Sequence, residues 1–190
     1  MDGRMILAID PATVTGWCAG RIGGNGRPES GTVRFGNPGQ SHETIFGVAD
    51  EWIEDLIEDY RPDIFLFEPP LPSWKMKKAT DKTVRLLHGL AGILQARAYR
   101  AGIPEIREAQ VQDVCGFMLG QRGVKSAEKK KHTKLMVKAM GFAPGDDNEA
   151  DAIAIWHYGC RCYAPGSVKV PYKEFPHLMP EGAIARAVFK

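Results

Sequence analysis

The sequence predicts a mixed α/β fold, in which helices flank a five-stranded sheet whose first three strands are antiparallel. Two patterns support this prediction. Between residues 5 and 35, short runs of apolar or alternating residues are separated by turn-forming segments, as in a β-meander. Beyond residue 41, segments with the apolar spacing of helices alternate with short apolar runs at residues 64–68 and 103–108, as in strands joined by helical crossovers.

The first strand, residues 5–10, reads Met-Ile-Leu-Ala-Ile-Asp and ends at Asp10. A mostly aliphatic run of this kind predicts a buried strand that places a carboxylate at its carboxyl end. A turn at residues 12–16 leads to a second strand at residues 16–22, and a glycine-rich hairpin leads to a third at residues 31–35. These three strands form the predicted antiparallel part of the sheet.

Helices and strands alternate in the middle of the chain. Ser41 is expected to cap a helix that ends near Tyr60, because apolar residues recur on one face of this segment and acidic residues on the other. The fourth strand, residues 64–68, repeats the pattern of the first, since a short apolar run ends in an acid, Glu68, before proline. A helix over residues 80–101 then leads to the fifth strand.

Three further helices are predicted before residue 163. A short one covers residues 111–119, a basic one is capped by Ser126 and ends at Gly141, and one rich in alanine and isoleucine covers residues 149–163. A flexible joint at residues 120–123 separates the first two, and a turn at residues 143–147 leads into the third.

Length and composition suit one domain, residues 1–163, followed by a C-terminal tail or arm, residues 164–190. The tail drapes over the core, reaches a partner subunit or is partly mobile, and the sequence leaves these alternatives open. The net charge of +2 requires any basic surface to arise from local clusters. No leader and no membrane-spanning run is recognised, which predicts a cytoplasmic protein without a membrane partner.

Three acids are expected to meet although they lie far apart in the sequence. Asp10 and Glu68 end two strands, and Asp151 lies near the start of the last helix. If these elements are neighbours, the carboxylates converge, and such a cluster is costly unless divalent cations neutralise it. Carboxylate oxygens are ligands that Mg²⁺ prefers, with Mn²⁺ as a substitute. Such ions activate water for in-line displacement at a phosphodiester without a nucleophilic side chain.

Four motifs occur in a suggestive order: Ile9-Asp10-Pro11 with Val14-Thr15-Gly16, Pro62-Asp63 leading to Phe67-Glu68, Ser126-Ala127-Glu128-Lys129, and Glu149-Ala150-Asp151-Ala152. Together they resemble the RuvC family of Holliday junction resolvases, within the RNase H-like superfamily, over a stretch from about Arg4 to His157. The resemblance implies an RNase H-like fold. It also implies a Mg²⁺-dependent homodimer that binds four-way DNA junctions and nicks two strands symmetrically.

The resemblance assigns the metal ligands. Asp10, Glu68 and Asp151 match metal-binding acids of the family. The remaining ligand position falls on Asn148, whose carbonyl oxygen can coordinate a cation but supplies no charge. Two alternatives stay open at this point: Asp147 takes over as the ligand, or Asn148 only caps the helix.

Lys129 matches a lysine of the family that lies close to the scissile phosphate, where it would stabilise charge on the transferring group. Its neighbour Lys130 is a rival for this role. The candidate catalytic residues are therefore Asp10, Glu68, Asp151, Asn148 and Lys129.

Two basic clusters are expected near the acids and predict a DNA-binding surface. They comprise Lys75, Lys77, Lys78, Lys82 and Arg85, and Arg122, Lys125, Lys130, Lys131, Lys134 and Lys138. Trp74 lies where the family has a loop that wedges into the junction centre. Stacking on an unpaired base would suit it, and anchoring in the core is an equal alternative.

Two other functions remain open on the sequence. Another RNase H-like nuclease, acting on branched DNA or RNA-containing duplexes, would share the fold and the acids. A catalytically impaired junction-binding protein is the second, because Asn148 and Gln112 are neutral where the family has a charged or basic residue.

Overall fold

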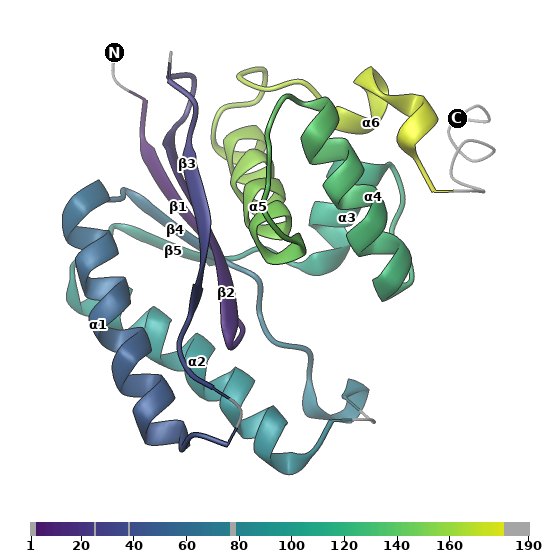
Figure 1. Ribbon diagram of the computed structural model, residues 1–190. Coiled ribbons are helices and arrows are strands. Elements are labelled where there is room, and N and C mark those ends of the chain that lie inside the picture. Colours follow the sequence, from purple (N-terminus) through teal and green to yellow (C-terminus); the bar gives the residue numbers. More distant parts are fainter. Residues whose placement is uncertain (1–2, 25, 38, 77–78, 181–190) are drawn as a thin grey trace.

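The computed structural model describes residues 3–24, 26–37, 39–76 and 79–180. A five-stranded sheet lies at its centre in the order β3-β2-β1-β4-β5 (Figure 1). The strands are β1 (Met5–Asp10), β2 (Val14–Arg21), β3 (Glu29–Arg34), β4 (Ile64–Phe67) and β5 (Glu105–Glu108). The main helices are α1 (His42–Tyr60), α2 (Asp81–Arg100), α3 (Val111–Leu119), α4 (Ser126–Ala139) and α5 (Asp147–Tyr163).

The sheet is mixed, as the sequence predicts. β1 pairs antiparallel with β2, and β2 pairs antiparallel with β3. On the other side of β1, β4 pairs parallel with β1, and β5 pairs parallel with β4. The helices α1 and α2 are the crossover connections that such parallel strands need. The predicted α/β class, with a five-stranded mixed sheet and flanking helices, is confirmed.

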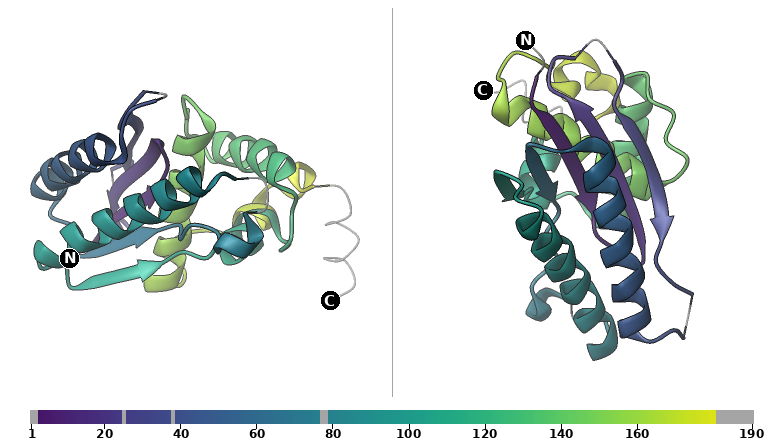
Figure 2. Two further views of the ribbon diagram at one scale, coloured as in Figure 1. Left: turned by 90° about the horizontal axis from the view of Figure 1, so that it is seen from below. Right: turned by 90° about the vertical axis from the view of Figure 1, so that its left-hand side faces the viewer.

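Side chains on β1 alternate between two cores, one on each face of the sheet. Leu7 and Ile9 join the core beneath α1 and α2, together with residues such as Leu94. Ile6 and Ala8 join the opposite core, which α3, α4 and α5 cover. Figure 2 shows the two helical layers on either side of the sheet. Because β1 is buried on both faces, its near-continuous apolar sequence follows from its position.

The helix ends agree with the capping residues predicted from the sequence, except at the start of α4. The Ser41 side chain accepts a hydrogen bond from the N–H of Thr44, so the predicted cap of α1 is confirmed. Gly102, with φ of 72°, follows α2 as expected. The predicted cap at Ser126 is wrong. Ser126 is already helical, and α4 begins after the extended Lys125, whose carbonyl accepts the N–H of Lys129.

After α5 the chain continues over the helical layer formed by α3 and α4. It contains α6 (Pro171–Glu174) and a 3-10 turn, η2 (Pro176–Leu178). Met179 and Tyr172 lie against Gly120 at the end of α3, and the carbonyl of Leu178 contacts the His132 ring at 2.8 Å. Of the alternatives for the tail, its described part, residues 164–180, therefore drapes over the core. Across the described ranges, no helix is both long and apolar enough to cross a membrane.

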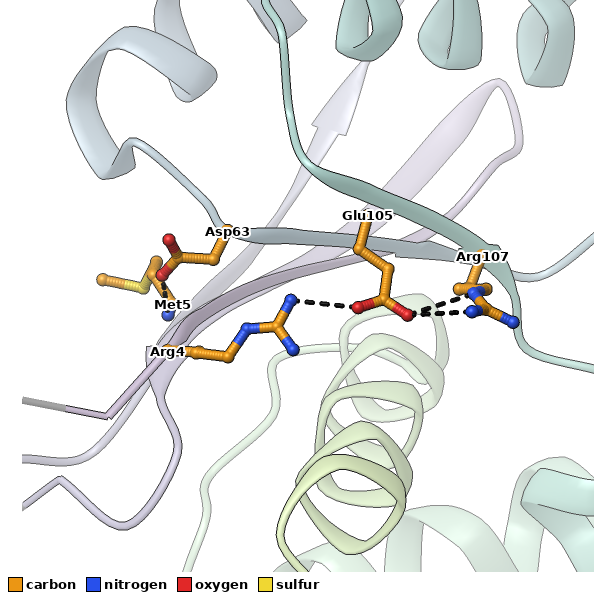
Figure 3. Close-up of polar contacts among 5 residues, drawn as sticks. All are labelled: Arg4, Met5, Asp63, Glu105 and Arg107. Carbon is orange, nitrogen blue, oxygen red and sulfur yellow. Dashed lines mark hydrogen bonds and ion pairs between the residues drawn. The ribbon is translucent and has the colours of Figure 1, made fainter.

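Polar side chains tie β1, β4 and β5 together at the amino-terminal ends of these parallel strands (Figure 3). The N–H of Met5 donates to the Asp63 carboxylate at 2.7 Å. Glu105 accepts from Arg4 at 3.0 Å and from Arg107 at 3.1 Å. These bonds reinforce the register of the three strands at the edge of the sheet where β1 begins.

Replacing Asp63 by alanine is expected to lower the free energy of unfolding by about 1–3 kcal/mol, since the Met5 N–H would lose a charged, partly buried acceptor. Asp63→Asn keeps an acceptor oxygen and should lose less. Urea denaturation of both variants measures the difference. Equal stability of Asp63→Ala and the unaltered protein would mean that water replaces this carboxylate without cost.

Candidate active site

The register of β1 and β4 brings the first two acids to one edge of the sheet. In this parallel pair Ile9 lies opposite Phe67, and the N–H of Glu68 donates to the carbonyl of Ile9 at 3.0 Å. Asp10 and Glu68 are the next residues of the two strands. They therefore leave neighbouring strands at the carboxyl end, where open α/β sheets commonly bind ligands.

The third acid comes from α5, which packs across β1 and β2. Asp151 lies in the second turn of this helix and is 4% exposed, one of few buried charged groups in the part of the chain that the structure describes. Apolar neighbours hold the helix here, including Ala152 and Ile155. Because it is buried, Asp151 does not serve as a solvated acid at the helix terminus, and its neighbours Lys129 and Glu68 explain its position.

Lys129 of α4 lies between the acids. Its Nζ is 3.2 Å from Oε2 of Glu68 and 3.7 Å from Oδ2 of Asp151. The three side chains are between 6% and 19% exposed, so these are mostly buried ion pairs. Lys130, the rival in sequence, is exposed and forms neither contact. The structure thus assembles Asp10, Glu68, Asp151 and Lys129 into one cluster, which we call the acid cluster.

The electrostatics of the acid cluster show crowded negative charge. Desolvation, followed by repulsion from Glu68 and Asp151, raises the pKa of Asp10 to about 8. Desolvation also raises the pKa of Asp151 to about 6, although Lys129 opposes this shift. Burial alone would lower the pKa of Lys129, but attraction to Asp151, Glu68 and Asp10 holds it above the usual lysine value. More positive charge would therefore stabilise the cluster.

The donor chemistry of the acid cluster suits a hard divalent cation, because it offers carboxylate oxygens in a partly desolvated, electronegative place. As the side chains lie, no group of three or more His, Cys, Asp and Glu residues in the described ranges is arranged to hold a metal ion. The Lys129 ammonium explains this arrangement, since it takes the position between Glu68 and Asp151 that a shared cation would need. Binding of a cation would require the lysine to shift.

The amino end of α5 settles one alternative for Asn148. The cap of this helix is Asp146, whose Oδ1 accepts the N–H of Glu149 at 2.9 Å, so a capping role for Asn148 is wrong. Asp147 pairs with Lys134 at 3.2 Å, and its charge contributes to raising the pKa of Asp151. Asn148 itself lies one turn before Asp151 on the helix.

Gly16 positions α5, a role that the sequence did not reveal. It lies on β2 opposite Asp10, and a Cβ built there would overlap the backbone carbonyl of Asn148. Only a residue without a side chain allows the helix to approach this closely. The sequence predicted Gly16 at the boundary between a turn and the second strand, whereas it lies inside β2, where glycine often marks such close approaches.

If the protein cuts four-way DNA junctions, as its sequence predicts, Gly16→Ala is expected to reduce the rate of junction cleavage at least tenfold. The start of α5 must then move away from β2 and carry Asp151 with it. Gly92→Ala is the matched control: on α2 an added methyl group meets no atom within 4 Å, so activity should stay unchanged. Initial cleavage rates of both variants provide the measurement. Full activity of Gly16→Ala would show that the helix has room to adjust.

The described basic residues belong to two parts of the chain, one that follows β4 and Glu68 and one that leads into and forms α4, the helix of Lys129. Lys75 lies in a 3-10 turn, η1 (Ser73–Lys75), after β4, and Lys82 and Arg85 lie in the first turns of α2. On the other side, Arg122 and Lys125 precede α4, which carries Lys130, Lys131, Lys134 and Lys138. Lys77 and Lys78 lie outside the described residues. Several are already paired, Arg122 with Asp113 at 2.6 Å and Arg85 with Asp81 at 3.3 Å.

Trp74 is 71% exposed in η1, so the alternative of a core anchor is wrong. Leu71, in the same connection between β4 and α2, is 50% exposed. Figure 1 shows this connection projecting from the carboxyl end of the sheet, below the start of α5. An aromatic ring presented to solvent in this way is available for stacking.

Cys115 of α3 is a further neighbour of the acid cluster that the sequence did not single out. Burial raises the pKa of its thiol, Lys129 lowers it, and Glu68 and Asp151 raise it further. The thiol is therefore neutral and inert, and it helps to line the cluster with a weakly polar surface.

A scan against models of known protein families finds no match for the chain. Solved structures, in contrast, are similar. RuvC of Thermus thermophilus has a TM-score of 0.63 at 17% identity, with 84% of this chain and 95% of that chain covered. T. thermophilus RuvC in complex with a Holliday junction substrate has a TM-score of 0.65 at 18% identity, with coverage of 87% and 98%. The yeast mitochondrial Holliday junction resolvase Ydc2 has a TM-score of 0.60 at 13% identity, with coverage of 92% and 82%. The chain therefore has the RNase H-like fold of the RuvC-type resolvases.

Proposed function

We propose that the protein is a metal-dependent endonuclease that resolves four-way DNA junctions by phosphodiester hydrolysis. The convergence of Asp10, Glu68 and Asp151 on Lys129 supports this function best, because such a cluster at the carboxyl end of the sheet fits cation-assisted phosphoryl chemistry. The similar fold of resolvases, one of them solved with a Holliday junction substrate, supports the choice of substrate.

Each member of the acid cluster has a distinct part in this proposal. Asp10, Glu68 and Asp151 would hold Mg²⁺, or Mn²⁺ as a substitute, with Asn148 or Asp147 as the further ligand. The bound ions would supply Lewis-acid activation of water and charge stabilisation at the phosphate. Lys129, released from Glu68 and Asp151, would donate hydrogen bonds to the phosphate oxygens on which negative charge grows. Buried thiol and aliphatic neighbours would limit access of bulk water.

DNA would lie across the carboxyl edge of the sheet, between the basic residues of α2 and those of α4. Neutralisation of phosphates by these side chains releases counterions and gives salt-dependent affinity. Trp74 would stack on an unpaired base at the junction centre. Symmetric cutting requires two active sites, so the proposal includes a homodimer, and it places the protein in the cytoplasm.

A substrate panel tests this function. Synthetic four-way junction, flap, plain duplex and RNA–DNA hybrid are supplied in parallel with Mg²⁺, with Mn²⁺, and with EDTA. We expect paired nicks in the junction with either metal and none in EDTA. Preferential cleavage of the flap or hybrid would instead support another RNase H-like nuclease of the same fold.

A junction-binding protein without catalysis is the second candidate, because Asn148 supplies no charge to the acid cluster. Tight binding of the junction without cleavage in either metal would establish it. Fluorescence anisotropy with labelled junction, run beside the cleavage assay, separates the two outcomes.

Asn148→Asp is expected to lower the half-saturating concentration of Mg²⁺ for cleavage by about three- to tenfold, because a charged ligand strengthens binding of a hard cation. Asp147→Asn is the matched control, since it removes a charge from a carboxylate that pairs with Lys134. Mg²⁺ titrations of the cleavage rate compare the variants. If Asp147→Asn weakens Mg²⁺ binding and Asn148→Asp changes nothing, Asp147 is the ligand.

A further inference from the structure

A cavity of about 160 Å³ lies outside the acid cluster, where β3 ends and α1 and α2 begin. Three basic side chains line it: Arg34 at the end of β3, His42 at the start of α1 and Lys82 in the first turn of α2. Ile45 and Leu86 form its apolar wall. Its position follows from the fold, because the start of α2, far along the chain, meets the end of β3 and the start of α1 at this place.

The cavity is positively charged. Among its described lining residues none is acidic, and neither Arg34 nor Lys82 has a carboxylate partner within 4.0 Å in the part of the chain that the structure describes. This sets them apart from Arg97 and Arg122, which carboxylates hold. Exposed cations without such partners keep their full charge for a ligand.

His42 adds an unsatisfied polar atom to this wall. Its Nε2 is buried and, within the described ranges, has no hydrogen-bond partner, while the ring packs against Phe46 with centroids 5.7 Å apart. A buried polar atom without a partner typically costs about 1–3 kcal/mol. If the ring turns so that Nε2 faces the cavity, an oxygen-rich ligand there would offset that cost.

Size and chemistry together select the ligand. Small-molecule sites usually measure about 300–1,000 Å³, so this cavity is too small for a nucleoside and suits a single tetrahedral anion. Arginine and lysine are the usual partners of phosphate oxygens. We propose that this cavity binds one backbone phosphate of the DNA substrate, through Arg34, Lys82 and His42. This step rests on the proposed function, because the DNA supplies the phosphate.

The cavity is linked directly to the acid cluster. Thr13 lines it, only three residues after Asp10, and the carbonyl of Thr13 accepts the N–H of Phe35 at 3.1 Å. Three residues of chain span at most about 10 Å even when extended, so Thr13 lies within a few nucleotide steps of Asp10 on the scale of a B-form strand. A phosphate bound here would therefore fix the strand within a few nucleotides of the bond held at Asp10.

Binding of junction DNA by a cleavage-deficient Asp10→Asn background tests the proposal. Adding Arg34→Gln should weaken binding about five- to tenfold at moderate salt and reduce the slope of log affinity against log salt by about 1. Arg100→Gln is the matched control, because it removes the same charge at the other end of α2, about 27 Å along the helix from Lys82. It should leave the slope within error of the background.

A neutral methylphosphonate linkage, moved one position at a time, locates the contact. At one position within a few nucleotides of the cleaved bond, the linkage should weaken binding of the Asp10→Asn protein and have little further effect on the Arg34→Gln double variant. An unchanged affinity and salt slope for Arg34→Gln, or equal loss in both proteins at every linkage position, would overturn the proposal.

A titration with inorganic phosphate tests the site without depending on junction cleavage. Millimolar phosphate should shift the ring NMR signals of His42 in the unaltered protein and not in Arg34→Gln. If the protein neither cuts nor prefers the junction but His42 still responds, the proposed function fails and the phosphate site stands. If His42 does not respond and Arg34→Gln binds DNA normally, the phosphate site fails by itself.

Discussion

Asp10→Asn is expected to abolish junction cleavage, by at least about a thousandfold, and to make the metal-free protein more stable. Loss of cleavage follows from removal of a charged ligand at the strand end where the acids converge. The gain in stability follows from removal of one of three crowded carboxylates. A gain of 1 kcal/mol corresponds to a rise in Tm of roughly 2–4 °C for a chain of this size.

The stability difference has a defined pH dependence. Because the pKa of Asp10 is raised to about 8 in the folded protein, folding favours its protonated form. This contribution to stability is complete below the usual aspartate pKa, near 4, and disappears as the pH rises through 8. The stability of Asp10→Asn relative to the unaltered protein should therefore grow between pH 5 and pH 9.

Melting curves in EDTA across that pH range, with cleavage assays beside them, check both parts. Asp55→Asn is the control, because Asp55 is exposed on α1 and carries the same charge. It should change neither activity nor the pH profile. Cleavage at a normal rate by Asp10→Asn would show that the acid cluster is not the catalytic centre.

Lys129→Met is expected to lower the cleavage rate of bound junction by about a hundred- to a thousandfold, the usual effect of losing a donor to developing negative charge. It should also destabilise the metal-free protein by several kcal/mol, on the order of 3, since Glu68 and Asp151 lose a mostly buried partner. Added Mg²⁺ should restore more stability to this variant than to the unaltered protein, because the lysine no longer competes for the carboxylates.

Lys130→Met provides the comparison. Lys130 is exposed and makes no ion pair with Glu68 or Asp151, so its loss should weaken DNA binding and leave the single-turnover rate of bound junction nearly unchanged. Single-turnover rates and Mg²⁺-dependent melting of both variants show whether Lys129 or Lys130 has the catalytic role. A larger rate loss in Lys130→Met would transfer the catalytic role to that residue.

Elements whose position follows from local pattern were predicted well from the sequence. The two apolar strands that end in Asp10 and Glu68 carry their own signal, because a buried parallel strand must be aliphatic and its end is free to carry a charge. Ser41 likewise caps α1 through a bond to a residue three positions later. Such local rules need no knowledge of the rest of the fold.

Features that depend on packing between distant segments could not be predicted in the same way. Ser126 has the chemistry of a cap, but the backbone turns one residue earlier, at Lys125. Asn148 and Asp146 are both good caps in sequence, and the helix begins so that Asp146 is the extended residue before it and accepts the N–H of Glu149. The overlap that excludes a side chain at Gly16, and the reach of Lys129 to acids 61 and 22 residues away, arise only when the sheet and helices assemble.

The polar ties among Arg4, Met5, Asp63 and Glu105 lie at the far end of the strands that lead to the acid cluster (Figure 3). A six-residue strand such as β1 separates the two ends by about 17 Å. Arg4, whose side chain is 45% exposed, is therefore a suitable place for an engineered cysteine carrying a dye or a surface linker. Molecules tethered there would present the opposite end of the sheet to incoming DNA, which suits single-molecule observation of turnover.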